Sequence, residues 1–239
     1  MDDLCGRACS SPALVAAFAA LILAGPAFGQ AKAPDISGTY WASQYNAKVQ
    51  VVGGGELPLT AKGKEAYEKN MAGLKDGSIT DDARKYCTPD GPVRNLATPY
   101  PFEIFQAPPG QVTIIHELNH QIRVVALDKP TPKYEELVAF PFYNGHAFGR
   151  WDGDTLVVET RGFNGKVWLD QLGKPSTEAL HVTEKFKRKD FGHMDIEITI
   201  DDPKAYTKPW TVNVGARLLP NSELLEFICL ENEKDVGRR

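Results

Sequence analysis

The chain has 239 residues, of which 42% are hydrophobic and 24% are charged, with a formal net charge of −4 at pH 7. This composition is that of an ordinary globular protein. Its charge gives no electrostatic footprint for a nucleic acid or an anionic lipid surface, so we expect no nucleic-acid partner.

The first 29 residues resemble a secretory signal. An apolar run covers residues 12–25, and small residues follow it at Ala27 and Gly29, as in a signal-peptidase site. The run is too short to span a bilayer comfortably; an uncleaved anchor is the alternative. We expect residues 30–239 to form one domain that is periplasmic or secreted, with no stable membrane anchor after cleavage.

The domain after the signal keeps two cysteines, Cys87 and Cys229. In an oxidising compartment, a pair of cysteines predicts one disulfide. A bridge across so long a loop stabilises a fold by roughly 4–5 kcal/mol in the chain-entropy treatment. The alternative is a pair of buried free thiols.

The first part of the domain combines one strand with helices. The stretch Asp35–Trp41 opens the domain, and a strand is expected to run to about Gln44. A helix is expected over 61–74, with Thr60 as its N-cap and with Tyr67 and Met71 on one face.

The next segment is expected to hold a short second helix and then a loop. Thr80 and the two aspartates after it suit the start of a helix that ends before Cys87. Residues 88–101 contain four prolines and predict an extended loop.

From Phe102 onward, the pattern is that of β-strands. Apolar and polar residues alternate clearly over 193–200, which predicts a strand with one buried face. A hairpin is expected at Trp151–Asp154, and 211–219 is expected to pair with 223–230. About eight to ten short strands follow the helices, so we predict a mainly β fold: a single antiparallel barrel without exposed edges.

Residues 116–120 read His-Glu-Leu-Asn-His and fit the zinc-protease pattern H-E-x-x-H. That site needs a helix, which brings both histidines to one metal. The flanking residues 112–115 and 122–125 are mostly β-branched and favour strands, and no third ligand follows. In one strand the two histidines would lie about 13 Å apart; alternatively, 119–121 forms a hairpin tip. We expect no metal site, and a zinc metalloprotease is the weakest of the hypotheses.

A first candidate site surrounds His146. An imidazole there would move a proton near neutral pH, and Arg150 would hold an anion. The aromatic residues Tyr143, Phe148 and Trp151 would line a pocket for the substrate. The alternative is a histidine satisfied by hydrogen bonds, beside an arginine stacked on Trp151.

A second candidate set alternates along the expected strand at Glu117, Asn119, Gln121 and Arg123. If these side chains face the barrel interior, they form a polar site in an apolar wall. If they face outward, they are a solvated surface. His120 in the same stretch is a second candidate base.

The third candidate is Trp168, in the loop over 163–170, where it would contact a ligand or plug one end of the barrel. The chain has no G-x-G-x-x-G, P-loop or G-x-S-x-G motif. We therefore expect no nucleotide and no other cofactor.

The chain resembles a family of secreted bacterial proteins of mostly unassigned function in three stretches, Pro99–Glu103, Gly149–Leu156 and Asp201–Thr211. Its opening Gly38–Trp41 is similar to the G-x-W start of lipocalin-like (calycin-like) barrels, with Tyr where Trp is usual. The resemblance implies a lipocalin-like barrel in the cell envelope, and it transfers no catalytic residue.

These residues predict a cofactor-independent enzyme of the lyase or isomerase type, acting on a small aromatic or apolar molecule in the barrel. His146 or His120 would be the base, Arg123 or Arg150 would stabilise negative charge, and Glu117 would orient the base or act as the acid. The alternative is a carrier of a small hydrophobic ligand without turnover.

Overall fold

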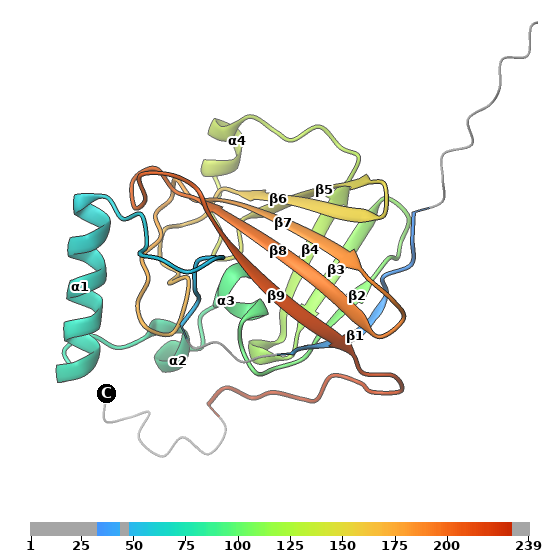
Figure 1. Ribbon diagram of the computed structural model, residues 1–239, viewed down its shortest axis with the longest axis horizontal. Helices are drawn as coiled ribbons and strands as arrows, with labels where there is room; N and C mark the ends of the chain where they lie inside the picture. The colour runs from blue at the N-terminus through green and yellow to red at the C-terminus, as the bar shows by residue number, and fades with distance from the viewer. Residues whose placement is uncertain (1–32, 44–47, 231–239) are drawn as a thin grey trace, which may run out of the picture. The chain divides into compact units, whose positions relative to one another are not determined.

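The computed structural model describes residues 33–43 and 48–230, so the predicted secretory signal lies outside the described residues. Nine strands form a closed barrel in chain order, and β9 returns to pair with β1 (Figure 1). The prediction of a mainly β chain with a closed barrel is confirmed.

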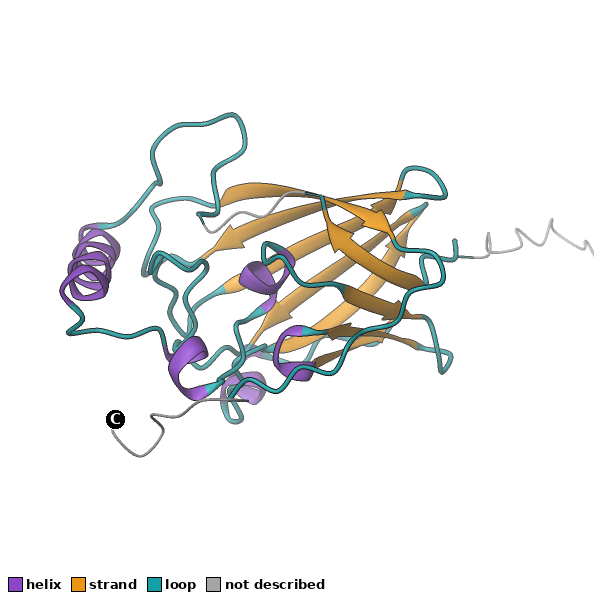
Figure 2. Cartoon of the chain, turned by 90° about the horizontal axis from the view of Figure 1, so that it is seen from below, coloured by secondary structure: helices purple, strands orange, loops and turns teal. Residues whose placement is uncertain are grey.

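The strands are β1 (Gly38–Ala42), β2 (Phe102–Phe105), β3 (Gln111–His116), β4 (Gln121–Leu127), β5 (His146–Asp152), β6 (Thr155–Arg161), β7 (His181–Arg188), β8 (His193–Asp201) and β9 (Trp210–Leu218). The helices are α1 (Ala61–Asp76), α2 (Asp82–Tyr86), α3 (Pro92–Leu96) and α4 (Tyr134–Val138), with a 3₁₀ turn η1 (Leu118–His120). Figure 2 shows that the helices lie in the connections between strands.

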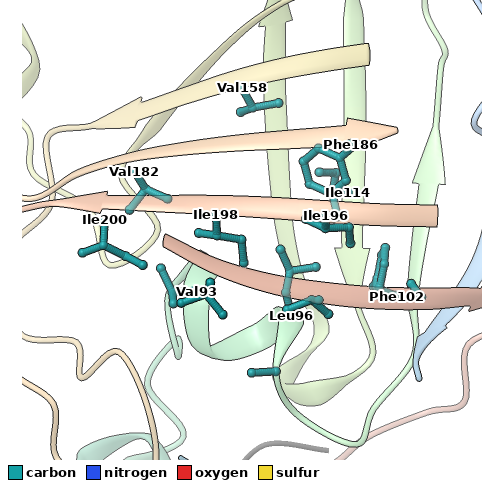
Figure 3. Packing of buried hydrophobic residues seen from close by; sticks show 14 of the residues in the cluster. Val93, Leu96, Phe102, Ile114, Val158, Val182, Phe186, Ile196, Ile198 and Ile200 are labelled. Carbon is teal, nitrogen blue, oxygen red and sulfur yellow. The ribbon is translucent and has the colours of Figure 1, made fainter. Parts of the chain in front are cut away.

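The barrel core follows the predicted alternation. In β8, Ile196, Ile198 and Ile200 are at most 1% exposed and point inward with residues of the neighbouring strands (Figure 3). Helix α3 adds Val93 and Leu96 to the same core. Burial of each such side chain contributes roughly 1.5–3 kcal/mol, so α3 is an integral part of the core.

The early helices form largely for the predicted reasons. Thr60 caps α1 by accepting a hydrogen bond from the Gly63 amide at 3.0 Å, and Gly77, at φ 79°, ends the helix. Asp81 caps α2. The expectation of an extended loop over 88–101 is wrong in part, because Pro92 occupies the first turn of α3 and proline suits that position.

The pairing of β4 with β5 is parallel, whereas the other pairings are antiparallel. The expectation of a wholly antiparallel barrel is therefore wrong at this position. A parallel pair needs a crossover connection of a dozen or more residues. Residues 128–145, which include the unpredicted helix α4, supply it.

Residues 223–230 do not form the predicted final strand. Strand β9 already pairs with β8 on one side and with β1 on the other. Closure therefore leaves no free edge beside β9 for another strand, and the segment continues outside the barrel.

A buried ion pair lies inside the barrel. The guanidinium of Arg123 donates to the Glu184 carboxylate, with Nη1 2.9 Å from Oε1, and Nη2 lies 3.3 Å from the Thr160 hydroxyl. Arg123 and Glu184 are 3% and 0% exposed. Two charges that are removed from water are tolerated only when they are paired in this way. The pair therefore requires that Arg123 of β4 and Glu184 of β7 both point into the barrel.

His116 lies in the same interior and is 2% exposed. Its ring centroid is 5.8 Å from that of Phe102. Burial, and then the positive charge of Arg123, lower the pKa of His116 to about 3. The imidazole is therefore neutral in the folded protein at any pH near neutrality.

This burial predicts a specific loss of stability in acid. The unfolded chain protonates His116 below its ordinary pKa of 6.5, whereas the folded chain does so only near 3. Between about pH 7 and about pH 5, the free energy of unfolding should fall by about 2 kcal/mol more for the wild type than for His116→Phe. Urea denaturation at both pH values measures this difference, and equal losses in the two proteins would contradict it.

Candidate functional site

The segment 116–120 is a turn and not a helix. His116 is the last residue of β3, and Asn119 and His120 have φ values of 57° and 45°. The predicted hairpin is present, with its tip at 117–120 rather than at 119–121, and the continuous strand is not formed. In residues 33–43 and 48–230, no three side chains of His, Cys, Asp or Glu are grouped to hold a metal ion. The helical geometry on which the zinc hypothesis depends is absent from this segment.

The residues around His146 lie on the barrel wall. Ala147 and Trp151 pack against the core, so the alternating residues His146, Phe148 and Arg150 face outward. They do not line the barrel interior, as the substrate-in-barrel hypothesis requires.

The outward residues have partners of their own. His146 Nε2 is 2.8 Å from the Phe140 carbonyl oxygen, and its ring lies 4.6 Å from that of Phe142. Arg150 pairs with Glu159 at 2.9 Å on the surface. Tyr143 precedes β5 and is half-buried. His146 and Phe148 line a groove of about 360 Å³ on the outer wall, and its lining residues include no carboxylate.

A different set of charged residues meets at the end of the barrel near α2 and α3. Asp81 precedes α2, Asp90 precedes α3, and Arg94 lies within α3. The guanidinium of Arg94 binds both Asp81 oxygens, at 3.0 and 2.6 Å. Its Nε lies 2.8 Å from Asp90 Oδ1. One buried cation is therefore shared by two buried carboxylates.

Side-chain amides fix the orientation of Asp90. Gln121 Nε2 donates to Asp90 Oδ2 at 3.2 Å, and Gln121 Oε1 accepts from the Asp90 amide at 3.1 Å. Asn95 exchanges two further hydrogen bonds with Gln121, at 2.9 and 3.2 Å. Asn119 Nδ2 lies 3.5 Å from Asp90 Oδ2. The carboxylate therefore has one defined position.

The environment of Asp90 shifts its pKa upward. The residue is 3% exposed. Burial raises the pKa of Asp90; the positive charge of Arg94 opposes this shift, and the negative charge of Asp81 adds to it. A buried carboxyl group with a shifted pKa that lines a cavity is a candidate for general acid or base catalysis.

Two cavities reach this cluster, and Asp90 and Arg94 line both of them. One has a volume of about 160 Å³, and the other about 300 Å³. Trp168, a predicted substrate-binding residue, lines the smaller cavity, and Asn119, another, lines the larger. Sequence reasoning missed Asp81, Asp90 and Arg94.

The C-terminal segment 220–230, which we call the strap, forms part of the larger cavity. The Leu225 amide donates to Glu117 Oε2 at 2.8 Å, and the Phe227 amide donates to His120 Nε2 at 3.1 Å. The ring of Phe227 contacts Tyr100 edge-on at 5.4 Å. Two predicted catalytic residues, Glu117 and His120, therefore bind the strap.

A disulfide joins the strap to the end of α2. Cys87 and Cys229 are bonded, with a Cα–Cα distance of 5.9 Å, as the sequence predicted. Cys229 also lines the larger cavity. The bridge thus holds a wall of the cavity in place, in addition to closing a long loop.

No protein-family model matches this chain, and no curated protein is similar to it. Within the described ranges, no helix is long and apolar enough to cross a membrane.

Removal of the bridge should release the strap. In Cys87→Ser/Cys229→Ser, we expect the Leu225 and Phe227 amides to exchange hydrogen much faster. Without the bridge, only the hydrogen bonds to Glu117 and His120 hold these two amides in place. The free energy of unfolding should fall by about 4 kcal/mol. Hydrogen exchange followed by NMR, with amides of β8 as the internal reference, measures the first effect. Unchanged exchange at both strap amides would show that the bridge does not hold the strap.

Proposed function

We propose that this chain is a periplasmic or secreted enzyme that transfers a proton on a small molecule, with Asp90 as the acid or base. The observation that carries the proposal is a buried carboxyl group of raised pKa between two cavities. Proton transfer by such a group accelerates reactions by roughly 10²–10⁴-fold. The disulfide supports an oxidising compartment.

The lining of the smaller cavity indicates the class of substrate. Trp168 and Val167 give it an apolar wall, and Lys166 adds a positive charge beside Asp90 and Arg94. The rest of the lining includes Thr80, Asp82 and Thr88, so we expect a small molecule that has both an apolar part and a polar group. Developing negative charge on that group would be stabilised by Lys166, whose side chain is exposed, because Arg94 is already occupied by Asp81 and Asp90. This arrangement supports a lyase or isomerase step without a redox cofactor.

The proposal moves the chemistry from the barrel interior to the barrel end. Arg123, which we expected to stabilise negative charge, is occupied by Glu184. His146 and Arg150 lie on the outer wall, and His120 binds the strap. Of the predicted site residues, Asn119 and Trp168 remain in the proposed site.

Deuterium incorporation tests this function even while the substrate is unidentified. The purified protein is incubated in D₂O with a small-molecule extract, and mass spectrometry follows metabolites that gain deuterium or change mass. We expect at least one such compound with the wild type. We expect its rate of change to fall by about 100-fold or more with Asp90→Asn, which keeps the size of the side chain and removes its acidity.

Two further variants separate chemistry from folding. Asp195→Asn changes a carboxylate that is exposed on β8, far along the chain from the cavities, and should keep the wild-type rate. Trp168→Ala removes a cavity wall outside the Asp90 hydrogen-bond network, and should raise KM while the fold persists. A compound that is retained but never converted would indicate the carrier instead. Full activity of a folded Asp90→Asn protein would contradict the proposal.

A further inference from the structure

A third cavity, of about 710 Å³, lies between α1 and the segment 48–59 that precedes it. It shares no lining residue with the two cavities at Asp90. Its volume is within the range of about 300–1,000 Å³ that is usual for small-molecule sites.

Helix α1 is held near its two ends. Its two buried residues are Gly63 and Gly73. A Cβ at Gly63 would collide with the Ala205 carbonyl group, and a Cβ at Gly73 would lie 2.5 Å from Ile79 Cγ1. Between these points one face of the helix lines the cavity, through Lys64, Tyr67, Glu68 and Met71. This is the i, i+3, i+4, i+7 face that normally packs against a core.

The walls of the cavity are mostly apolar. Tyr67 and Met71 come from the helix, and Met71 is 48% exposed. The segment 48–59 contributes four further apolar residues, Val49, Val51, Leu57 and Leu59, among polar ones. Methionine is unbranched and adapts to the shape of a ligand. An apolar molecule in this space would give the inner face of α1 the contacts that the protein itself does not supply.

Two of the lysines that line the cavity are Lys174, which is buried, and Lys48, which is exposed. The Lys174 ammonium pairs with Asp170 and lies 5.7 Å from the centre of the Tyr67 ring. Burial lowers the pKa of Lys174, Asp170 opposes this shift, and the nearby positive charge of Lys48 adds to it. Asp170 neutralises Lys174, and the exposed Lys48 adds a positive charge close to it.

The acidic residues of this lining are solvated. Glu56 and Glu68 are exposed, and Glu68 is 3.8 Å from Lys64. The buried anion beside Lys174 is Asp170, and the charge of the exposed Lys48 is the one that a ligand can reach.

We infer that the cavity under α1 binds an apolar molecule that carries one carboxylate, with the carboxylate directed toward Lys48 and the apolar part against Met71 and Leu57. This site is separate from the barrel interior and from Asp90, and its occupancy does not depend on the proposed enzymatic activity.

Calorimetric titration of the full chain with octanoate, 1-octanol and acetate tests the inference. We expect octanoate to bind about tenfold or more tightly than 1-octanol, because 1-octanol lacks the charge that Lys48 attracts. Acetate should not bind measurably, because it lacks the apolar part. Equal affinity for octanoate and 1-octanol, or no heat from octanoate, would overturn the inference.

Variants then locate the site. Lys48→Gln should weaken octanoate binding about fivefold and leave 1-octanol binding unchanged. Leu57→Asp should abolish both, with circular dichroism to verify the fold. Lys62→Gln, on the exposed part of the same helix, is the matched control and should bind octanoate as the wild type does. Wild-type octanoate affinity in Lys48→Gln would overturn the assignment.

Discussion

The interaction of Arg94 with Asp81 and Asp90 organises the end of the barrel. It joins the start of α2 to α3, and Asp90 extends the contact to Gln121 at the start of β4. Removing one partner from a buried ion pair typically costs about 3–5 kcal/mol, because the remaining charge stays buried. A second cation, Arg84, lies 3.8 Å from Asp81. Burial, and then the negative charge of Asp81, raise the pKa of Asp90, while Arg94, the Gln121 hydrogen bond and Arg84 oppose this shift.

The barrel supplies a rigid support for this end. Its interior holds apolar side chains and the Arg123–Glu184 pair, and α3 packs Val93 and Leu96 against the core. The three cavities discussed for chemistry or binding lie in connections between strands. Loops on a rigid scaffold commonly carry function, and here a disulfide and the side chains of Glu117 and His120 keep the strap beside one of them.

Local patterns predicted the parts of the fold that depend on local physics. The alternation in β8, the Thr60 cap and the pairing of Cys87 with Cys229 follow from residue type and spacing. The parallel pairing of β4 with β5 depends on contacts across the barrel, so no local pattern indicated it. The prediction of a strand over 223–230 was wrong, because β9 already pairs with β8 and β1 in the closed barrel and has no free edge.

The candidate site was harder to predict for a similar reason. Asp81 and Asp90 have residue types that suit turns and helix starts, and only the folded chain brings both to Arg94. Histidines are candidate bases in a sequence because their ordinary pKa is near neutrality. In the structure, His116 is buried without a charge partner of opposite sign, and His146 faces outward. Burial and partners, which the sequence does not show, decide which group can transfer a proton.

The most direct test of this account is the titration of the Asp90 carboxyl carbon by NMR, assigned by comparison with Asp90→Asn. We expect the pKa of Asp90 to lie above the ordinary aspartate value, because burial and the negative charge of Asp81 outweigh the stabilisation of the carboxylate by Arg94. A pKa at or below that value would mean that Arg94 keeps Asp90 fully ionised. In that case the cluster would be a structural ion network and not the proton-transfer site of an enzyme.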